Sequence, residues 1–138
     1  MDVRDLARRA GIGASALTVL VLVAPYVIIA EQQELLIAYY AAGPIGAGGV
    51  GLFALLSAVV FASVERGNVD PGTRAGVVVV LGVSTVLLAV VWELAIDPTV
   101  RFGFPAEYRW LEWHSLAVIA ASLPIPVCAG VYARELLG

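Results

Sequence analysis

The stretch from Gly43 to Ser63 contains no charged residue. It is about 21 residues long, and a helix rising roughly 1.5 Å per residue would cross the ~30 Å hydrocarbon layer of a bilayer over that length. Three further apolar runs have similar lengths, and the four lie at about residues 11–30, 43–63, 75–96 and 115–132. This pattern predicts an all-α fold, in which a four-helix transmembrane bundle forms a single integral membrane domain over residues 1–138.

The overall composition supports the same fold class. Hydrophobic residues make up 61% of the 138 residues, and the mean hydropathy is +0.94. An ordinary globular domain has an apolar fraction of roughly 45–50%. Because the long runs show no in–out alternation, a transmembrane barrel is excluded. The excess of acidic residues and the absence of lysine are typical of a salt-loving organism.

Small residues recur every three or four positions along the second run. In a soluble helix each glycine would cost roughly 0.5–1 kcal/mol relative to alanine. In lipid, small residues instead let two helices approach closely. We therefore expect a helix-packing face formed by Gly43, Ala47, Gly51, Ala54, Ala58 and Ala62. Packing within the chain is the preferred interpretation, and a dimer seam or a pore lining stays open.

Prolines predict where the helices bend or break. Pro25 lies in the outer third of the first run and has no N–H, so it frees a carbonyl near Val21 that must find another partner in lipid. Gly43-Pro44 is the predicted break before the second run, because proline fits the first turn of a new helix. The fourth run contains Pro124 and Pro126, each of which removes one intrahelical hydrogen bond, so we expect that its middle is not a regular helix.

Two segments are predicted to lie at the outer surface. The segment 31–42 carries two acids, two glutamines and the pair Tyr39 and Tyr40, whose amphipathic rings are typical headgroup anchors. In the outer loop between the third and fourth spans, residues 105–114 begin with a proline and mix aromatic with charged side chains. We expect them to form a short interfacial helix.

The arginines predict the orientation. Cytoplasmic loops of membrane proteins are enriched in basic residues. With the N-terminus inside, two arginines, Arg101 and Arg109, lie outside, and the cytoplasm contains Arg4, Arg8, Arg9, Arg66, Arg74 and Arg134. We therefore expect a multi-pass protein of the cell membrane with both termini in the cytoplasm.

Glu93 and His114 are the candidates for a polar site. Glu93 is the one acid inside an apolar run, and an ionisable residue in a membrane is by default a functional hypothesis. His114 opens the fourth span on the same side. We expect both to join one outer polar site with Arg101 or Arg109, which would fix the loop over the bundle. Interfacial structural roles are the preferred interpretation for both side chains, and a proton- or cation-binding site at Glu93 or a pH sensor at His114 is the alternative.

Other chemistry is poorly represented in this chain. A single cysteine, Cys128, cannot form an internal disulfide, and a single histidine cannot build a multi-histidine metal site or a bis-histidine haem within one chain. We find no nucleophile elbow, phosphate loop or basic patch for nucleic acid. We therefore expect no metal, no cofactor, no nucleic-acid partner and no enzymatic activity.

Four motifs stand together along the chain: YYAAGP before the second run, an Asp-Pro turn with arginines, WELAIDP at the end of the third run, and a terminal YAREL. With them the chain resembles an uncharacterised family of small four-span haloarchaeal membrane proteins over nearly its whole length. The resemblance implies a four-helix membrane fold and a haloarchaeal origin, but no activity. Small multidrug transporters also have four spans, but they have a glutamate in the middle of the first helix, which this chain lacks.

Two functions compete. The preferred one is a structural or accessory membrane protein that packs through its Gly/Ala face, with the lipid bilayer and a second copy or a membrane complex as partners. The alternative is a small oligomeric transporter or channel that uses Glu93 and His114 near its outer mouth. A membrane enzyme ranks third, because paired catalytic groups are missing.

Overall fold

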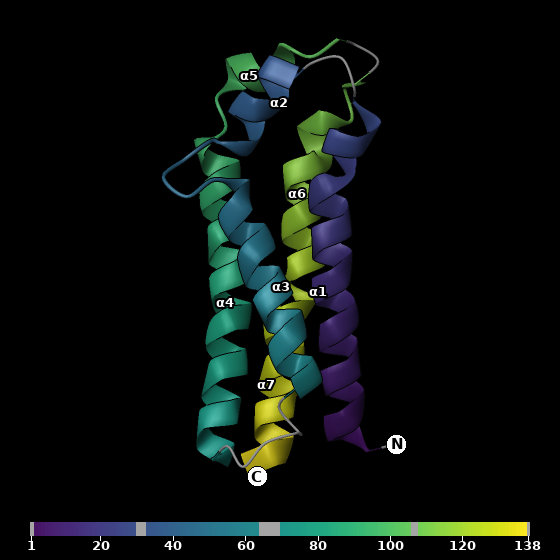
Figure 1. Cartoon of the computed structure of the whole chain (residues 1–138), viewed down its shortest axis with the longest axis vertical. Coiled ribbons are helices and arrows are strands. Elements are labelled where there is room, and N and C mark those ends of the chain that lie inside the picture. Colours follow the sequence, from purple (N-terminus) through teal and green to yellow (C-terminus); the bar gives the residue numbers. More distant parts are fainter. Residues whose placement is uncertain (1, 30–32, 64–69, 106–107, 138) are drawn as a thin grey trace.

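The computed structural model of the chain describes residues 2–29, 33–63, 70–105 and 108–137. Every regular element in these residues is a helix, which confirms the predicted all-α class (Figure 1). In chain order the helices are α1 (Val3–Ile28), α2 (Gln33–Tyr40), α3 (Ala47–Ser63), α4 (Pro71–Ala95), α5 (Pro98–Phe102), α6 (Leu111–Ser122) and α7 (Pro124–Leu137).

The helices α1, α3, α4 and the α6–α7 pair run side by side and form a bundle (Figure 1). Helix α1 packs against α3 and α7, and α4 packs against the same two helices from the other side. Both termini lie at one end of the bundle, which we call the terminal end, and α2 and α5 lie at the other, which we call the loop end. In the described part of the chain, three helical stretches are long and apolar enough to cross a membrane, namely Val3–Ile28, Pro71–Ala95 and Leu111–Leu137. The second predicted span corresponds to α3, which is apolar but has only 17 residues.

Two helices begin earlier than their apolar runs, because aspartates cap them. The Asp2 carboxylate accepts a hydrogen bond of 2.8 Å from the N–H of Asp5, so α1 begins at residue 3. Asp70 accepts one of 3.3 Å from the N–H of Thr73, and Pro71 occupies the first turn of α4. Both helices therefore extend past the apolar runs at the terminal end.

The loop end differs from the prediction. The proposed interfacial helix over 105–114 is wrong, because α6 begins at Leu111, while residues 106–107 lie outside the described residues. A short helix does lie in this loop, but it is α5, which Asp97 caps through the N–H of Thr99 at 2.9 Å. Residues 33–40 of the expected outer segment form α2.

Two breaks were predicted at prolines; the one between α2 and α3 is present, whereas the fourth run stays helical through its prolines. Between α2 and α3 the chain turns at Gly43 and Gly46, whose φ angles of 81° and 75° suit only glycine well. The fourth run divides into α6 and α7 at Leu123, which keeps helical angles and donates to the carbonyl of Ile119 at 3.0 Å. The prolines of α7 lie in its first turn, where an N–H is not needed, so the rod stays nearly straight (Figure 1).

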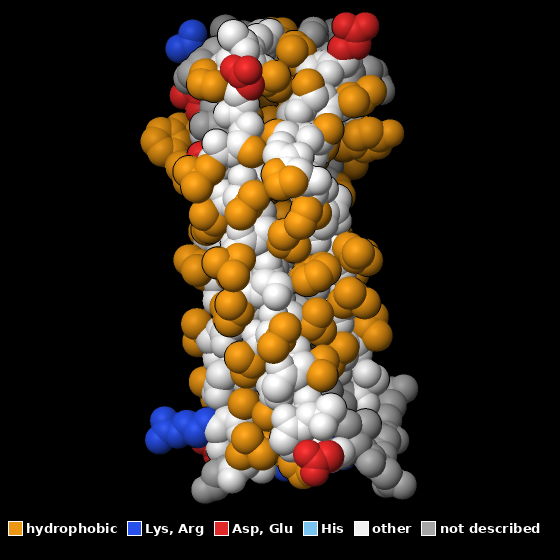
Figure 2. All heavy atoms as spheres, turned by 90° about the vertical axis from the view of Figure 1, so that its left-hand side faces the viewer, with side chains coloured by type: hydrophobic (Ala, Val, Ile, Leu, Met, Phe, Trp, Pro, Cys, Tyr) orange, Lys and Arg blue, Asp and Glu red, His pale blue; other side chains and the backbone are white. Residues whose placement is uncertain are grey.

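The bundle is apolar on its outside. A band of hydrophobic side chains covers the visible face between the two ends, where the charged residues gather (Figure 2). Inside, small hydroxyls are buried and donate to the carbonyl one turn earlier in their own helix, at 2.7–2.8 Å; they belong to Ser15, Thr18, Ser57 and Thr85. This arrangement satisfies hydroxyls without water, as a lipid environment requires.

Candidate functional site

Polar side chains and aromatic rings meet at the loop end of the bundle. We call this group the outer cluster; it contains Tyr39, Tyr40, Trp92, His114 and the main-chain carbonyls of Val21 and Leu22. Its members come from α1, α2, α4 and α6. The cluster therefore joins helices that lie far apart in the sequence.

Pro25 leaves free the main-chain carbonyl to which the outer cluster bonds. Residue 25 would normally donate its N–H to the carbonyl of Val21, and proline has none. His114 takes its place, because its Nε2 lies 2.6 Å from the Val21 oxygen. A carbonyl only accepts, so Nε2 donates. In the neutral imidazole, Nδ1 then accepts from the Tyr39 hydroxyl, which is also 2.6 Å away. The partner predicted for the freed carbonyl is thus a side chain from α6.

A second side chain fastens the same turn of α1. The Tyr40 hydroxyl donates to the carbonyl of Leu22 at 2.6 Å. Burial raises the pKa of Tyr40 to about 12, although a hydrogen bond from the main-chain N–H of Tyr26 acts in the opposite direction. The phenol is therefore a neutral donor at every physiological pH.

Trp92 connects α2 to α4. Its Nε1–H donates to the main-chain carbonyl of Tyr39 at 2.9 Å, near the end of α2, where carbonyls lack helical partners. The Trp92 ring also lies parallel to the ring of Tyr40, with centroids 6.2 Å apart and planes 2° apart. Together these contacts hold α2 against three helices of the bundle.

The polar site expected from the sequence is arranged differently. Both ring nitrogens of His114 are occupied by Tyr39 and Val21, so the histidine hydrogen-bonds to these groups and not to Glu93. Glu93 is half-buried on α4, directly after Trp92. Arg109 is exposed, and the side chain of Arg101 lies outside the described residues.

The tyrosine pair was predicted to anchor the protein at the headgroups, which is wrong for Tyr39. Its side chain is 0% exposed and lies beside His114. The sequence places the two tyrosines next to a predicted chain break, but no pattern of neighbouring residues predicts that Tyr39 is buried. The break at Gly43-Pro44 and the presence of a histidine that needs a hydrogen-bond donor are the only features that point to its position.

The Gly/Ala face of α3 divides between inside and outside. Ala47 and Ala54 are buried, together with Val50, Ser57 and Phe61. Gly51 and Ala58 are half-buried, whereas Gly43 and Ala62 are exposed; Gly43 lies in the turn before the helix. The inner half of the face packs within the chain.

Two glycines outside that face lie where neighbouring helices contact each other closely. A Cβ atom on Gly82 of α4 would lie 2.9 Å from the Cα and N atoms of Pro126, so α4 and α7 touch backbone to backbone. A Cβ on Gly11 of α1 would lie 2.6 Å from ring atoms of Phe61. Sequence reasoning missed both, because each is a single glycine without a repeating pattern.

An apolar groove of about 510 Å³ runs along the outside of the bundle between α1 and α3. Its lining includes Leu22, Gly48, Gly51 and Leu52, and it ends at Tyr26 and Tyr40. A second hollow of about 330 Å³ lies against α2 and shares these two tyrosines. The two spaces therefore meet at the outer cluster.

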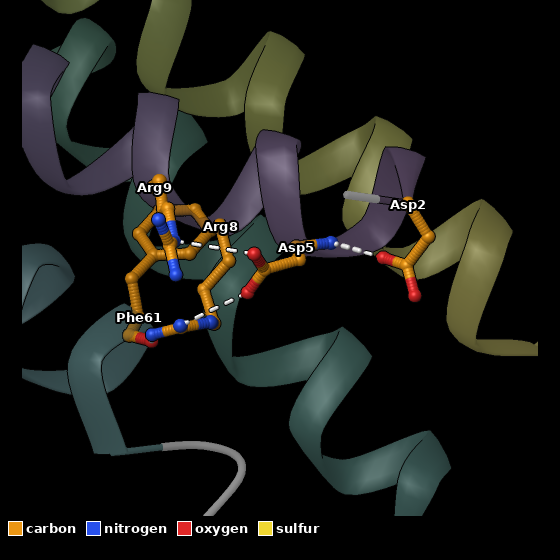
Figure 3. A network of polar contacts seen from close by, with 5 residues as sticks. All are labelled: Asp2, Asp5, Arg8, Arg9 and Phe61. Atoms are coloured by element: carbon orange, nitrogen blue, oxygen red, sulfur yellow. Dashed lines mark hydrogen bonds and ion pairs between the residues drawn. The ribbon is translucent and has the colours of Figure 1, made fainter.

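At the terminal end, Arg8 caps the last turn of α3. Its Nη1 donates to the carbonyl of Phe61 at 3.2 Å, and its Nη2 contacts the Asp5 carboxylate at 3.1 Å (Figure 3). Asp5 also pairs with Arg9 at 3.2 Å. A carbonyl in the last turn has no helical partner, so this arginine satisfies it from the neighbouring helix.

Comparison with known proteins defines the family but no activity. Among the described residues, no three histidine, cysteine or acidic side chains are grouped so that they could hold a metal ion. No curated protein and no solved structure matches the chain. A family model matches residues 1–137, which confirms the expected membership in an uncharacterised family, whereas the haloarchaeal origin stays a prediction. The chain belongs to the family of unknown function DUF7548.

Proposed function

We propose that this chain is an integral protein of the cell membrane with four spans, α1, α3, α4 and the α6–α7 rod, and that it acts as a structural or accessory subunit. The observation that carries the proposal is the distribution of side chains. Large aliphatic residues face outward, for example Leu20 at 65% and Val127 at 64% exposure, while buried hydroxyls bond their own helices. Such a surface is stable in lipid and would aggregate in water.

Helix α3 is the shortest of the proposed spans. Its 17 residues extend over about 25 Å, which is at the lower limit for crossing the hydrocarbon layer. It packs against both α1 and α4, two of the long apolar helices. A short span between two longer ones is accommodated by modest local thinning or by tilting of its neighbours.

The arginines support an orientation with both termini in the cytoplasm. Among the described residues, Arg4, Arg8 and Arg9 lie at the start of α1, at the terminal end. Arg74 in the first turn of α4 and Arg134 near the end of α7 lie at the same end. The excess of basic residues there follows the positive-inside rule.

The outer cluster favours a structural role over the transporter alternative. A proton or cation pathway through His114 would need water at the imidazole, yet this side chain is only 5% exposed and both its nitrogens bond protein groups. The bonds fasten α2 and α6 to the turn of α1 that Pro25 disrupts. The residues therefore act as a clamp on the fold.

The groove between α1 and α3 is the surface that we assign to a partner helix. Gly48 faces open space, and a Cβ on Gly51 would meet only the end of the Leu22 side chain. Small residues at such a place let a second backbone approach closely in lipid. This position, and not the whole predicted Gly/Ala face, is where the chain offers room to another helix.

Site-specific photo-crosslinking tests the subunit role. A photoreactive amino acid replaces Leu52, which lines the groove, or Leu87 on the outer side of α4; their exposures of 55% and 59% are closely matched. In native membranes we expect a discrete protein adduct from position 52 and only lipid adducts from position 87. Lipid adducts alone at both positions would contradict the role as a subunit.

A further inference from the structure

The outermost turn of α1 depends on side chains from other helices. Pro25 removes one main-chain bond, and His114 and Tyr40 supply side-chain bonds to the carbonyls of Val21 and Leu22. Beyond Pro25, residues 26–28 are helical, and the C-cap Ile29 closes this last turn by donating to the Pro25 carbonyl at 2.8 Å. A proline that removes a ladder bond between two intact helical parts is the usual place for a helix to bend.

Tyr40 also separates the two hollows on the outside of the bundle. Together with Tyr26, it lines both the groove along α3 and the smaller space against α2. The Tyr40 ring rests on Trp92, and its hydroxyl is held by α1. The hydrogen bond to the Leu22 carbonyl, together with the N–H of Tyr26, therefore fixes the ring at the junction of the two spaces.

We propose that Tyr40 is a latch: its bond to the Leu22 carbonyl holds the hinge at Pro25 closed, and its release lets the outer turn of α1 move away and join the two hollows into one groove. The latch is a conformational device, independent of which partner occupies the groove. Tyr26 offers a matched control, because it lines the same spaces while its hydroxyl has no hydrogen-bond partner among the described residues.

Hydrogen exchange measured by mass spectrometry tests the latch in the full chain, purified in lipid nanodiscs. Because one such bond contributes modestly, we expect Tyr40→Phe to speed the exchange of the amides of residues 26–29 roughly two- to tenfold. Tyr26→Phe should leave those rates unchanged. Equal rates in Tyr40→Phe and the parent protein would contradict the proposal, and so would equal acceleration by both variants.

Two further measurements guard against a general loss of structure. In a Trp110→Phe/Trp113→Phe background, Trp92 is the only tryptophan left, and it is 1% exposed. Lipids with brominated chains should quench the Trp92 fluorescence more strongly in Tyr40→Phe than in Tyr26→Phe.

Pro25→Ala restores an N–H opposite the Val21 carbonyl and removes the hinge. The amides of Pro25→Ala/Tyr40→Phe should therefore exchange as slowly as those of Pro25→Ala alone. Unchanged quenching, or full acceleration in the double variant, would overturn the latch.

Discussion

Replacing His114 with phenylalanine is expected to lower the free energy of unfolding by about 2–6 kcal/mol, because two buried hydrogen bonds are lost at roughly 1–3 kcal/mol each. The variant keeps an aromatic ring of similar size but can bond neither the Val21 carbonyl nor the Tyr39 hydroxyl. The carbonyl has no second partner in its own helix at residue 25, since that residue is proline. Unfolding of the purified protein in mild detergent, followed by circular dichroism, measures the loss.

A second substitution identifies the cause of that loss. Pro25→Ala provides an N–H for the Val21 carbonyl, so it should recover part of the stability of His114→Phe. Trp113→Phe serves as a control, since this neighbouring ring is 68% exposed and should change stability little. If His114→Phe unfolds like the parent protein, or if Pro25→Ala brings no recovery, the clamp on α1 is not what the histidine provides.

Gly82→Ala is expected to destabilise the bundle by about 1–3 kcal/mol, the usual cost of overpacking. The added methyl group would lie 2.9 Å from the backbone of Pro126, and backbone atoms at the start of α7 cannot rotate away as a side chain would. The two helices must move apart along their contact. Thermal unfolding under the same conditions measures the difference.

Gly76 is the matched control in the same helix. A Cβ there meets nothing within 4 Å, so Gly76→Ala should leave packing intact and stabilise the helix by roughly 0.5–1 kcal/mol. The two substitutions are chemically identical and should differ in sign. A stabilising Gly82→Ala would show that α4 and α7 do not touch at this position.

The sequence identified the need for a bond near Pro25 but not its donor. Proline lacks an N–H wherever it stands, so the freed carbonyl of Val21 follows from one residue. The donor, His114, lies 93 residues away, and only the packing of α6 against α1 brings it there. Likewise, the position of Glu93 at the edge of an apolar run suggested it as the partner of His114. The actual partner, Tyr39 on α2, lies in a segment that was expected to be a loop.

The predictions of the helix boundaries and of the close helix contacts were wrong for different reasons. Asp70 and Pro71 belong to both turns and helix starts, so their composition alone did not decide where α4 begins. The repeated small residues of the second run suggested a packing face, yet a backbone-to-backbone contact lies at Gly82, which has no periodic partner. A contact between two backbones depends on the facing helix, and one helix alone does not reveal it.

Cysteine labelling at the two ends of α3 tests the four-span account most directly. In a Cys128→Ala background, cysteine replaces Ile45 just before α3 or Ser63 at its last residue, both of which are exposed. On intact cells a membrane-impermeant maleimide should label position 45, and position 63 should react only after the membrane is permeabilised. The opposite pattern would contradict the orientation, and labelling of both positions from the same side would show that α3 does not cross the membrane.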